Sequence, residues 1–141
     1  MRTDLPDVNV LVALFVPNHQ HHEPAQRWLT DTEQFATTPM TEAGLVRVLM
    51  SGLPGQAGIS GQSALSRLRE LRAHERWTFW PDGTSLADQR AVTGHLQGPK
   101  QVTDTHLLNL AMAQGSRLAT FDGGIGAPLD RQTRRYLNEL R

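Results

Sequence analysis

Segments with strand-like composition alternate with segments of helical periodicity along almost the whole chain. Strands are predicted at 3–6, 35–39, 77–81 and 117–121. Helices are predicted at 8–16, from near His22 onward, and at 41–52, 60–76, 85–96, 105–115 and 131–141. Such alternation is typical of an α/β sandwich with a parallel sheet. Neither a repeat nor a linker interrupts it, so residues 1–141 are expected to form a single domain.

The composition narrows the possible chemistry. The chain has no cysteine, which excludes disulfides, zinc–thiolate sites and a cysteine nucleophile. The first apolar run, VLVALFV at 10–16, is too short to span a bilayer and does not fit a signal peptide, so a cytoplasmic protein without membrane contact is expected. The 14 basic and 14 acidic residues balance, and any contact with nucleic acid must therefore be local.

Four acidic residues stand at the ends of predicted elements. Asp104 precedes apolar residues at spacings of three, four, seven and eight, which is one face of an α-helix. Asp7 and Glu42 precede similar stripes, with apolar residues at spacings of three, four and seven. Asp122 directly follows the strand predicted at 117–121. The first three carboxylates are therefore predicted to point toward the side of a helix that should be buried.

Helix capping accounts for some of these acids but not for all of them. Asp is a preferred N-cap because its side chain accepts a hydrogen bond from a free backbone N–H. Glu is a poor cap, and Thr41 is better placed to cap the helix that contains Glu42. Thr103 could likewise cap the later helix and free Asp104. Because sites in parallel α/β folds form beyond the carboxyl ends of the strands, we expect the four acids to converge there.

Converging carboxylates repel one another unless something compensates their charge. Two carboxylates about 4 Å apart repel by roughly 4 kcal/mol at an effective dielectric constant of 20. None of the four motifs has a Lys or Arg close in sequence that would be an obvious partner. Either some of these acids stay protonated or a cation lies among them, and all-oxygen ligands favour Mg²⁺ or Mn²⁺ over zinc. The pattern therefore favours a metal site.

Four sequence motifs resemble those of a known family. LPDVNVLVAL, TEAGLVRVL, QVTDTHLLNLA and LATFDGG are similar to the four acidic motifs of PIN-domain nucleases, and most similar to those of the VapC toxins of bacterial toxin–antitoxin pairs. The motifs occur in order from Asp7 to Asp122, and the linking FWPDG also fits. The resemblance implies an α/β three-layer sandwich with a central, mainly parallel sheet.

The resemblance also implies an activity and a set of site residues. It implies an endoribonuclease that requires Mg²⁺, with Mn²⁺ as a possible substitute, and that cleaves cellular RNA. The metal would activate a water molecule and neutralise charge on the scissile phosphate, while one carboxylate could act as general base. A homodimer and a cognate antitoxin, whose C-terminal segment blocks the site, are implied as well. The acidic residues that match the family's metal-binding quartet are Asp7, Glu42, Asp104 and Asp122.

Four further residues are candidates for supporting roles. Asn9 and Thr103 match family positions that orient the metal ligands. Arg47, five residues after Glu42, could contact a phosphate or form a surface ion pair. His106 lies two residues after Asp104, on a different side of the helix, and could touch substrate.

Other conspicuous residues have plainer interpretations. The histidines at 19, 21 and 22 lack a recognised zinc spacing and are expected to be solvated. The arginines of RLRELRAHER, at 67–76, are expected to form a solvated helix face rather than an RNA contact. The aromatic residues of WTFW, at 77–80, could stack on bases, but burial in the core is the preferred interpretation.

Two other functions remain as alternatives to a nuclease. A PIN fold without activity could serve only as a binding partner, although the intact acidic quartet disfavours it. A receiver-like signalling domain also gathers acids at strand ends, but it needs an adjacent acidic pair after the first strand and a lysine after the last. Here a single acid follows the first strand, and Lys100 precedes the third motif. A haloacid-dehalogenase phosphatase would need Asp at the position of Asn9.

Overall fold

The computed structural model describes residues 2–88, 91–92, 96 and 98–141. Within these residues five strands form one sheet in the order β3-β2-β1-β4-β5, and every neighbouring pair is parallel. The predicted parallel sheet is thereby confirmed. The strands are β1 (Thr3–Pro6), β2 (Gln34–Thr37), β3 (Trp77–Phe79), β4 (Arg117–Thr120) and β5 (Leu137–Glu139).

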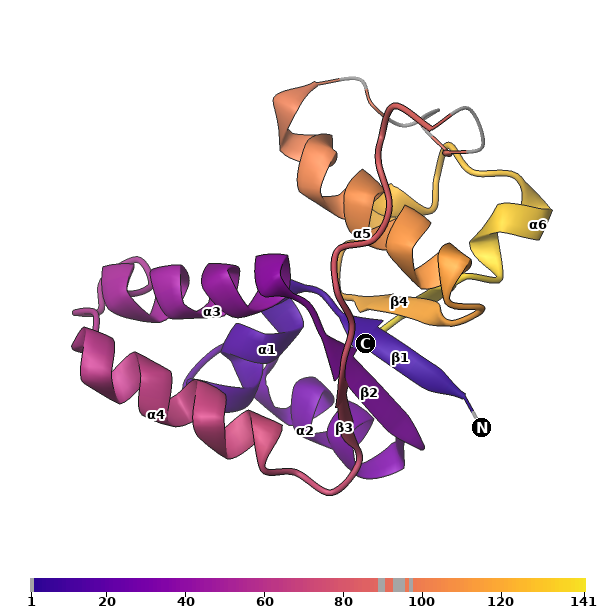
Figure 1. Cartoon of the computed structure of the whole chain (residues 1–141). Coiled ribbons are helices and arrows are strands. Elements are labelled where there is room, and N and C mark those ends of the chain that lie inside the picture. Colours follow the sequence, from indigo (N-terminus) through magenta and orange to yellow (C-terminus); the bar gives the residue numbers. More distant parts are fainter. Residues whose placement is uncertain (1, 89–90, 93–95, 97) are drawn as a thin grey trace.

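Helices cover both faces of this sheet, which confirms the three-layer sandwich (Figure 1). One face carries α1 (Val8–Phe15), α2 (His22–Asp31), α3 (Pro39–Ser51) and α4 (Gly61–Arg72). The other carries α5 (Val102–Ala113), with the short α6 (Arg131–Arg134) beyond it. Two single 3₁₀ turns, η1 (Pro99–Gln101) and η2 (Gly123–Ile125), adjoin α5 and β4. None of the described helices has the length and apolar character needed to cross a membrane.

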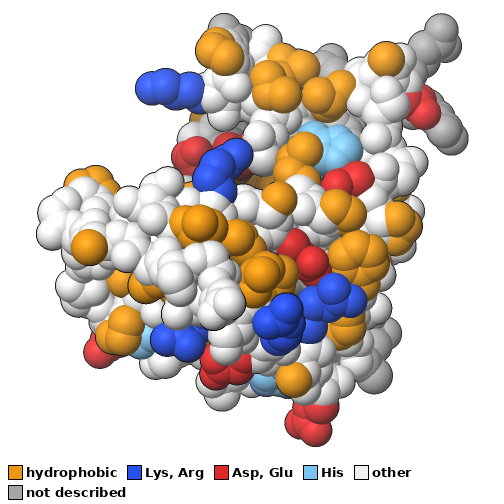
Figure 2. All heavy atoms as spheres, turned by 60° about the vertical axis from the view of Figure 1, so that its left-hand side comes forward, with side chains coloured by type: hydrophobic (Ala, Val, Ile, Leu, Met, Phe, Trp, Pro, Cys, Tyr) orange, Lys and Arg blue, Asp and Glu red, His pale blue; other side chains and the backbone are white. Residues whose placement is uncertain are grey.

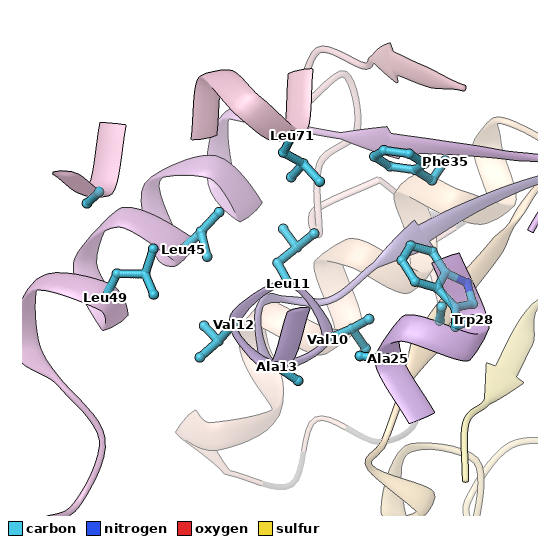
Figure 3. Close-up of a cluster of buried hydrophobic side chains, with 12 residues drawn as sticks. Val10, Leu11, Val12, Ala13, Ala25, Trp28, Phe35, Leu45, Leu49 and Leu71 are labelled. Atoms are coloured by element: carbon cyan, nitrogen blue, oxygen red, sulfur yellow. The ribbon is translucent and has the colours of Figure 1, made fainter. Parts of the chain in front are cut away.

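The larger core cluster holds α1 in place. Figure 3 shows Leu11 pointing toward Leu71 of α4, while Val12 points toward Leu45 and Leu49 of α3. Burying a leucine or valine side chain stabilises a fold by about 1.5–3 kcal/mol. Because α1 is apolar on several sides, it packs against α2, α3 and the sheet at once. This packing fixes the position of Asp7 at its first turn.

The second core cluster lies on the opposite face and holds α5. Leucines of this helix pack against Leu5 of β1 and Leu118 of β4, and all of these side chains are buried. The apolar stripe predicted behind Asp104 is therefore real. It docks α5 with its N-terminal end toward the carboxyl edge of the sheet (Figure 1).

Both predicted helix caps were wrong, for different reasons. Helix α3 begins two residues before Thr41, because Pro39 suits the first helical position and Thr38 caps it. The Thr38 hydroxyl accepts a hydrogen bond from the Thr41 N–H at 3.2 Å, and the Thr41 hydroxyl accepts one from the Thr38 N–H at 2.9 Å. Helix α5 continues directly from η1, starting at Val102 with no side-chain cap. Thr103 is therefore an exposed residue inside the first turn.

The predicted C-terminal helix at 131–141 was also wrong. Only Arg131–Arg134 are helical, and Leu137–Glu139 form the edge strand β5. Leu137 and Leu140 have a helix-like spacing of three, but in a strand this spacing places them on opposite faces. Leu137 packs in the cluster beside α5, whereas Leu140 packs in the cluster beside α1. An extended conformation is favoured because it lets this segment contribute one leucine to each core, whereas a helix would place both leucines on one face.

The helix predicted at 85–96 is not seen where the structure describes this stretch. Residues 85–88 and 91–92 form turns, and the remaining part of the prediction lies largely outside the described residues. The side-chain amide of Asn109 on α5 binds both backbone groups of Val92, at 2.6 and 2.8 Å. These bonds take the place of a helical ladder at this position.

Candidate functional site

Asp7 lies at the carboxyl edge of the sheet, directly after the central strand β1. It caps α1, with Oδ1 accepting a hydrogen bond from the Val10 N–H at 3.0 Å. Its other oxygen, Oδ2, accepts one from the Thr120 hydroxyl at 2.6 Å. The residue is only 5% exposed. The capping interpretation is thus correct for Asp7, but it explains only one of its two oxygens.

Asp122 reaches the same place from the neighbouring strand β4. Its backbone N–H donates to the Thr120 hydroxyl oxygen at 3.0 Å, and its Oδ1 accepts from the Gly124 N–H at 2.9 Å. The Thr120 hydroxyl therefore links Asp122 to Asp7. Unlike Asp7, Asp122 is exposed.

Asp104, the third residue of α5, completes a group of three acids at this edge. Burial, followed by the charges of Asp7 and Asp122, raises the pKa of Asp104 to about 6. Burial also raises the pKa of Asp7 and the charge of Asp122 adds to it, against the lowering effect of hydrogen bonds from Thr120 and Val10. The charges of Asp7 and Asp122 therefore reach Asp104, and that of Asp122 reaches Asp7.

Glu42 lies on α3 at the same edge but has different partners. Its Oε2 accepts a hydrogen bond from the Thr37 hydroxyl at 2.7 Å, and its Oε1 lies 3.7 Å from Nη1 of Arg72. This cation could not be predicted from local sequence, because Arg72 is thirty residues away and meets Glu42 only when α4 packs on α3. The charges that act on Asp104 are those of Asp7 and Asp122, so Glu42 stands somewhat apart.

Two threonines that the sequence analysis missed position these acids. Thr37 is the last residue of β2 and Thr120 the last of β4, and both are fully buried. Each donates its hydroxyl proton to a carboxylate, Thr37 to Glu42 and Thr120 to Asp7. A threonine at the carboxyl end of a predicted strand, followed at short range by an acid, was the available signal.

The supporting residues predicted from sequence are placed variously. Asn9 and Thr103 are exposed in the first turns of α1 and α5, and the backbone N–H of Asn9 helps to lower the pKa of Asp7. Arg47 is exposed and shares with Glu42 a groove between α3 and α4. His106 is buried, with its Nε2 at 3.5 Å from Oδ1 of Asp82.

Asp82 was also missed as an individual residue. It lies after β3 in the FWPDG segment, and its Oδ2 accepts a hydrogen bond from the Met40 N–H at 3.2 Å. Through Met40 and His106 it touches the first turns of both α3 and α5. Asp82 thereby ties together the two helices that carry Glu42 and Asp104.

The three clustered histidines are occupied with local contacts. The ring of His21 stacks on Phe121 with the ring centroids 4.3 Å apart, and Nδ1 of His22 lies 2.7 Å from the Ala13 carbonyl oxygen. These contacts anchor the loop before α2 rather than leaving the side chains simply solvated. No metal-binding group among the described residues includes them.

The group of Asp7, Asp104 and Asp122 is a candidate metal site. In the part of the chain that the structure describes, no three His, Cys, Asp or Glu side chains are already grouped as they would have to be to hold an ion. The charges of Asp7 and Asp122 nevertheless raise the pKa of Asp104, and that of Asp122 raises the pKa of Asp7, so a cation among the three carboxylates would relieve an existing repulsion. Carboxylate oxygens are the ligands that Mg²⁺ and Mn²⁺ prefer. The donor chemistry of these residues fits such an ion, and their side chains would have to move together to hold it.

A comparison with known families bears on this site. The family model described as the PIN domain matches residues 5–127, which include all four acids. The chain belongs to the PIN-domain family. The resemblance inferred from the four motifs is thereby confirmed.

Curated relatives from Mycobacterium tuberculosis place this PIN domain among the VapC proteins. "Ribonuclease VapC39" is 42% identical over 130 residues, covering 87% of this chain and 91% of that protein. "Ribonuclease VapC38" is 43% identical over 126 residues, covering 86% of each. "Ribonuclease VapC29" is 40% identical over 126 residues, covering 87% and 88%. The enzyme class expected from the motifs, a ribonuclease, is supported by all three.

A solved structure supports the PIN fold independently of sequence. The crystal structure of Mycobacterium tuberculosis VapC20, titled as a sarcin–ricin loop cleaving toxin, superposes with a TM-score of 0.63. The match covers 89% of this chain and 96% of that one, at 13% sequence identity. At this identity the likeness concerns the fold alone.

Replacing Thr120 with Val is expected to weaken the site without changing its shape. The variant keeps the side-chain volume but removes the hydroxyl that joins Asp7 to the backbone of Asp122. Groups that orient metal ligands typically contribute about 10–100-fold to affinity or activity, so a loss of cleavage in that range is expected. Thr120→Ser keeps the hydroxyl and should retain activity. Equal cleavage rates for Thr120→Val and the unmodified protein would show that the hydroxyl is dispensable.

Proposed function

We propose that this protein is a divalent-metal-dependent endoribonuclease that cleaves cellular RNA in the cytoplasm as the toxin of a toxin–antitoxin pair. The observation that carries the proposal is the group of three aspartates at the carboxyl edge of a parallel sheet, where burial and neighbouring negative charge raise the pKa values of Asp7 and Asp104. Such a group is costly to maintain in the absence of a cation. Its occurrence in a chain related to VapC ribonucleases supports a catalytic role.

Four acidic residues would make up the proposed site. Asp7, Asp104 and Asp122 would hold Mg²⁺ or Mn²⁺, and Glu42 would complete the acidic edge from the opposite helix. When bound, the ion supplies Lewis-acid stabilisation of the charge on a scissile phosphate and activates water. The chain's own contribution is to hold the carboxylates in place through Thr120 and Thr37.

One of the four carboxylates would also act as general base for the attacking water. Without metal, burial and the charges of Asp7 and Asp122 raise the pKa of Asp104 to about 6, so a bound cation would be needed to keep this group ionised in its buried position. We assign supporting roles to the exposed residues near the acids. Arg47 would contact a phosphate of the RNA. Asn9 and Thr103, in the first turns of α1 and α5, would orient the metal ligands or the substrate.

An antitoxin and a second copy of the chain are the protein partners that we propose. The groove between α3 and α4 contains Glu42 at one end and is lined by apolar side chains, including the exposed Met50 and Leu65. A segment bound there would reach the acidic edge and block it. If an antitoxin bound the Leu65→Asp variant as tightly as the unmodified protein, this groove would not be its binding site. Light scattering of the purified chain tests the proposed homodimer.

Cleavage of a mixed cellular RNA pool by the purified protein tests the proposed function. The reaction is run with Mg²⁺, with Mn²⁺ and with EDTA, beside an Asp7→Ala variant purified identically. We expect cutting that requires metal and is absent from the variant. Equal cutting by both proteins would indicate a contaminant. No cutting by a folded protein, across RNA pools from several sources, would favour a PIN fold that acts only by binding.

A further inference from the structure

Three side chains form a compact cluster beside Glu42. The guanidinium carbon of Arg72, at the end of α4, lies 4.5 Å from the ring centroid of Trp77 and 5.2 Å from that of Phe79. The two rings of β3 are 6.5 Å apart. The cluster of Arg72, Trp77 and Phe79 is called the Arg72 platform below. It lies at the same edge of the sheet as the acids, because Arg72 also approaches Glu42.

The inner part of the Arg72 platform is fixed and its outer part is open. The indole N–H of Trp77 donates to the Thr37 hydroxyl at 2.8 Å, and that hydroxyl in turn donates to Glu42. The Arg72 side chain is 44% exposed and Phe79 is 39% exposed. Phe79 therefore departs from the sequence-based interpretation, which favoured the core for the aromatics. Arg72 is exposed, as expected for a solvated helix face, but it also contacts two aromatic rings and Glu42.

Figure 2 gives the setting of such side chains on this side of the molecule. Basic side chains lie directly against exposed hydrophobic ones near the middle of the face, with acidic side chains close by. With a net charge of zero, the protein as a whole does not attract a nucleic acid by its net charge. Contacts with RNA must then come from local groups that combine charge with flat apolar surface.

A guanidinium plane beside an exposed aromatic ring suits one chemical class of ligand in particular. Unpaired nucleobases stack on aromatic rings and on arginine planes, and every base offers a face for this contact. Duplex RNA offers no such face, because its bases are already stacked. The position beside Glu42 would place a stacked base next to the phosphate at the acidic edge.

We propose that the Arg72 platform binds an unpaired nucleobase of the RNA substrate, next to the phosphate that is cleaved. This inference rests on the proposed function and adds the residues that would receive one base of the substrate, with the base stacked on Arg72 and Phe79. Within the platform, the hydrogen bond from Trp77 to Thr37 fixes the inner ring. The same hydroxyl network couples the platform to Glu42.

Binding of labelled RNA tests the proposal without requiring cleavage. In an Asp104→Asn background with Mg²⁺, fluorescence anisotropy measures the affinity for a fluorescein-labelled single-stranded RNA of about 12 nucleotides, and for its duplex. Phe79→Leu removes the ring but keeps an apolar side chain, and Arg72→Lys keeps the charge but removes the plane. Each is expected to raise Kd for the single strand about 5- to 100-fold and to leave duplex binding unchanged.

Arg67→Ala is the matched control, since it removes an exposed arginine from the same helix outside the platform. It should change Kd about twofold or less, by loss of charge alone. In cleavage assays with Asp104 intact, Phe79→Leu should raise KM and leave kcat unchanged. Circular dichroism establishes that each variant is folded.

The possible outcomes separate this proposal from the proposed function. If the unmodified protein cleaves RNA but Phe79→Leu and Arg72→Lys bind the single strand normally, the platform is not a base site and the nuclease stands. If those variants lose antitoxin binding instead, the platform is a protein contact and the proposal is wrong. If cleavage is absent but the variants lose single-strand binding selectively, the Arg72 platform is a base-binding site and the proposed nuclease function is wrong.

Discussion

Asp104→Asn is expected to abolish RNA cleavage while leaving the fold intact. The variant keeps the size and polarity of the side chain but removes one of the three charges gathered at the carboxyl edge of the sheet. It removes one of the carboxylates that we propose to hold the metal, so the activation of water and the stabilisation of phosphate charge that the ion would supply should be lost. Rates of cleavage of a mapped RNA target would be measured with saturating Mg²⁺.

The same substitution should make the metal-free protein more stable. Asp7 and Asp122 act on Asp104 as like charges, so a neutral amide relieves repulsion in the folded state. A gain of 1 kcal/mol raises the Tm of a chain of this size by about 4 °C. Asp130→Asn is the control, because Asp130 is an exposed cap and Asn caps a helix equally well. Normal cleavage by Asp104→Asn would refute the assigned site.

Without metal, the protein is expected to lose stability as the pH rises from about 4 through 6. The folded state holds a proton on Asp104 up to a pKa of about 6, against an ordinary pKa of 3.8 for an aspartate, so it binds more protons than the unfolded chain in that window. Stability therefore falls with rising pH and levels off above 6. The raised pKa of Asp7 acts in the same direction. Thermal melts in EDTA over this range measure the effect.

Metal should reverse this loss, since Mg²⁺ and protons compete for the same carboxylates. Addition of Mg²⁺ is expected to raise Tm clearly at about pH 7.5 and little at about pH 5. Comparing the unmodified protein with Asp104→Asn cancels the titration of histidines and other acids that the two proteins share. If Mg²⁺ stabilised both proteins equally at both pH values, its binding would lie elsewhere.

The acids that follow strands could be placed from the sequence, because a parallel sheet brings all its carboxyl ends to one edge. Asp7 and Asp122 were predicted in this way and they do lie together. Asp104 follows no strand, but the apolar stripe behind it correctly indicated which face of α5 is buried. The partner of Glu42 could not be predicted, because nothing local links residue 42 to Arg72 before α3 and α4 pack.

The errors arose where two local signals competed. Thr41 was predicted to cap α3, but the cap is Thr38, and Thr38 and Pro39 together define the start of this helix. Thr41 is the second residue of the capping box. At the C-terminus a helix-like spacing of leucines concealed a strand that contributes to two cores. In both cases tertiary packing chose between alternatives of similar local propensity.

The hydrogen bond between Thr120 and Asp7 joins residues 113 positions apart in the chain. The central strand β1 is made first, yet its neighbour β4 comes only after α5. A growing polypeptide therefore carries Asp7 and Glu42 long before Asp122 exists to stand beside them. The order of the strands thus delays assembly of the acidic edge until β4 and the residues after it have been made, and a growing chain that stops before β4 lacks both Thr120 and Asp122.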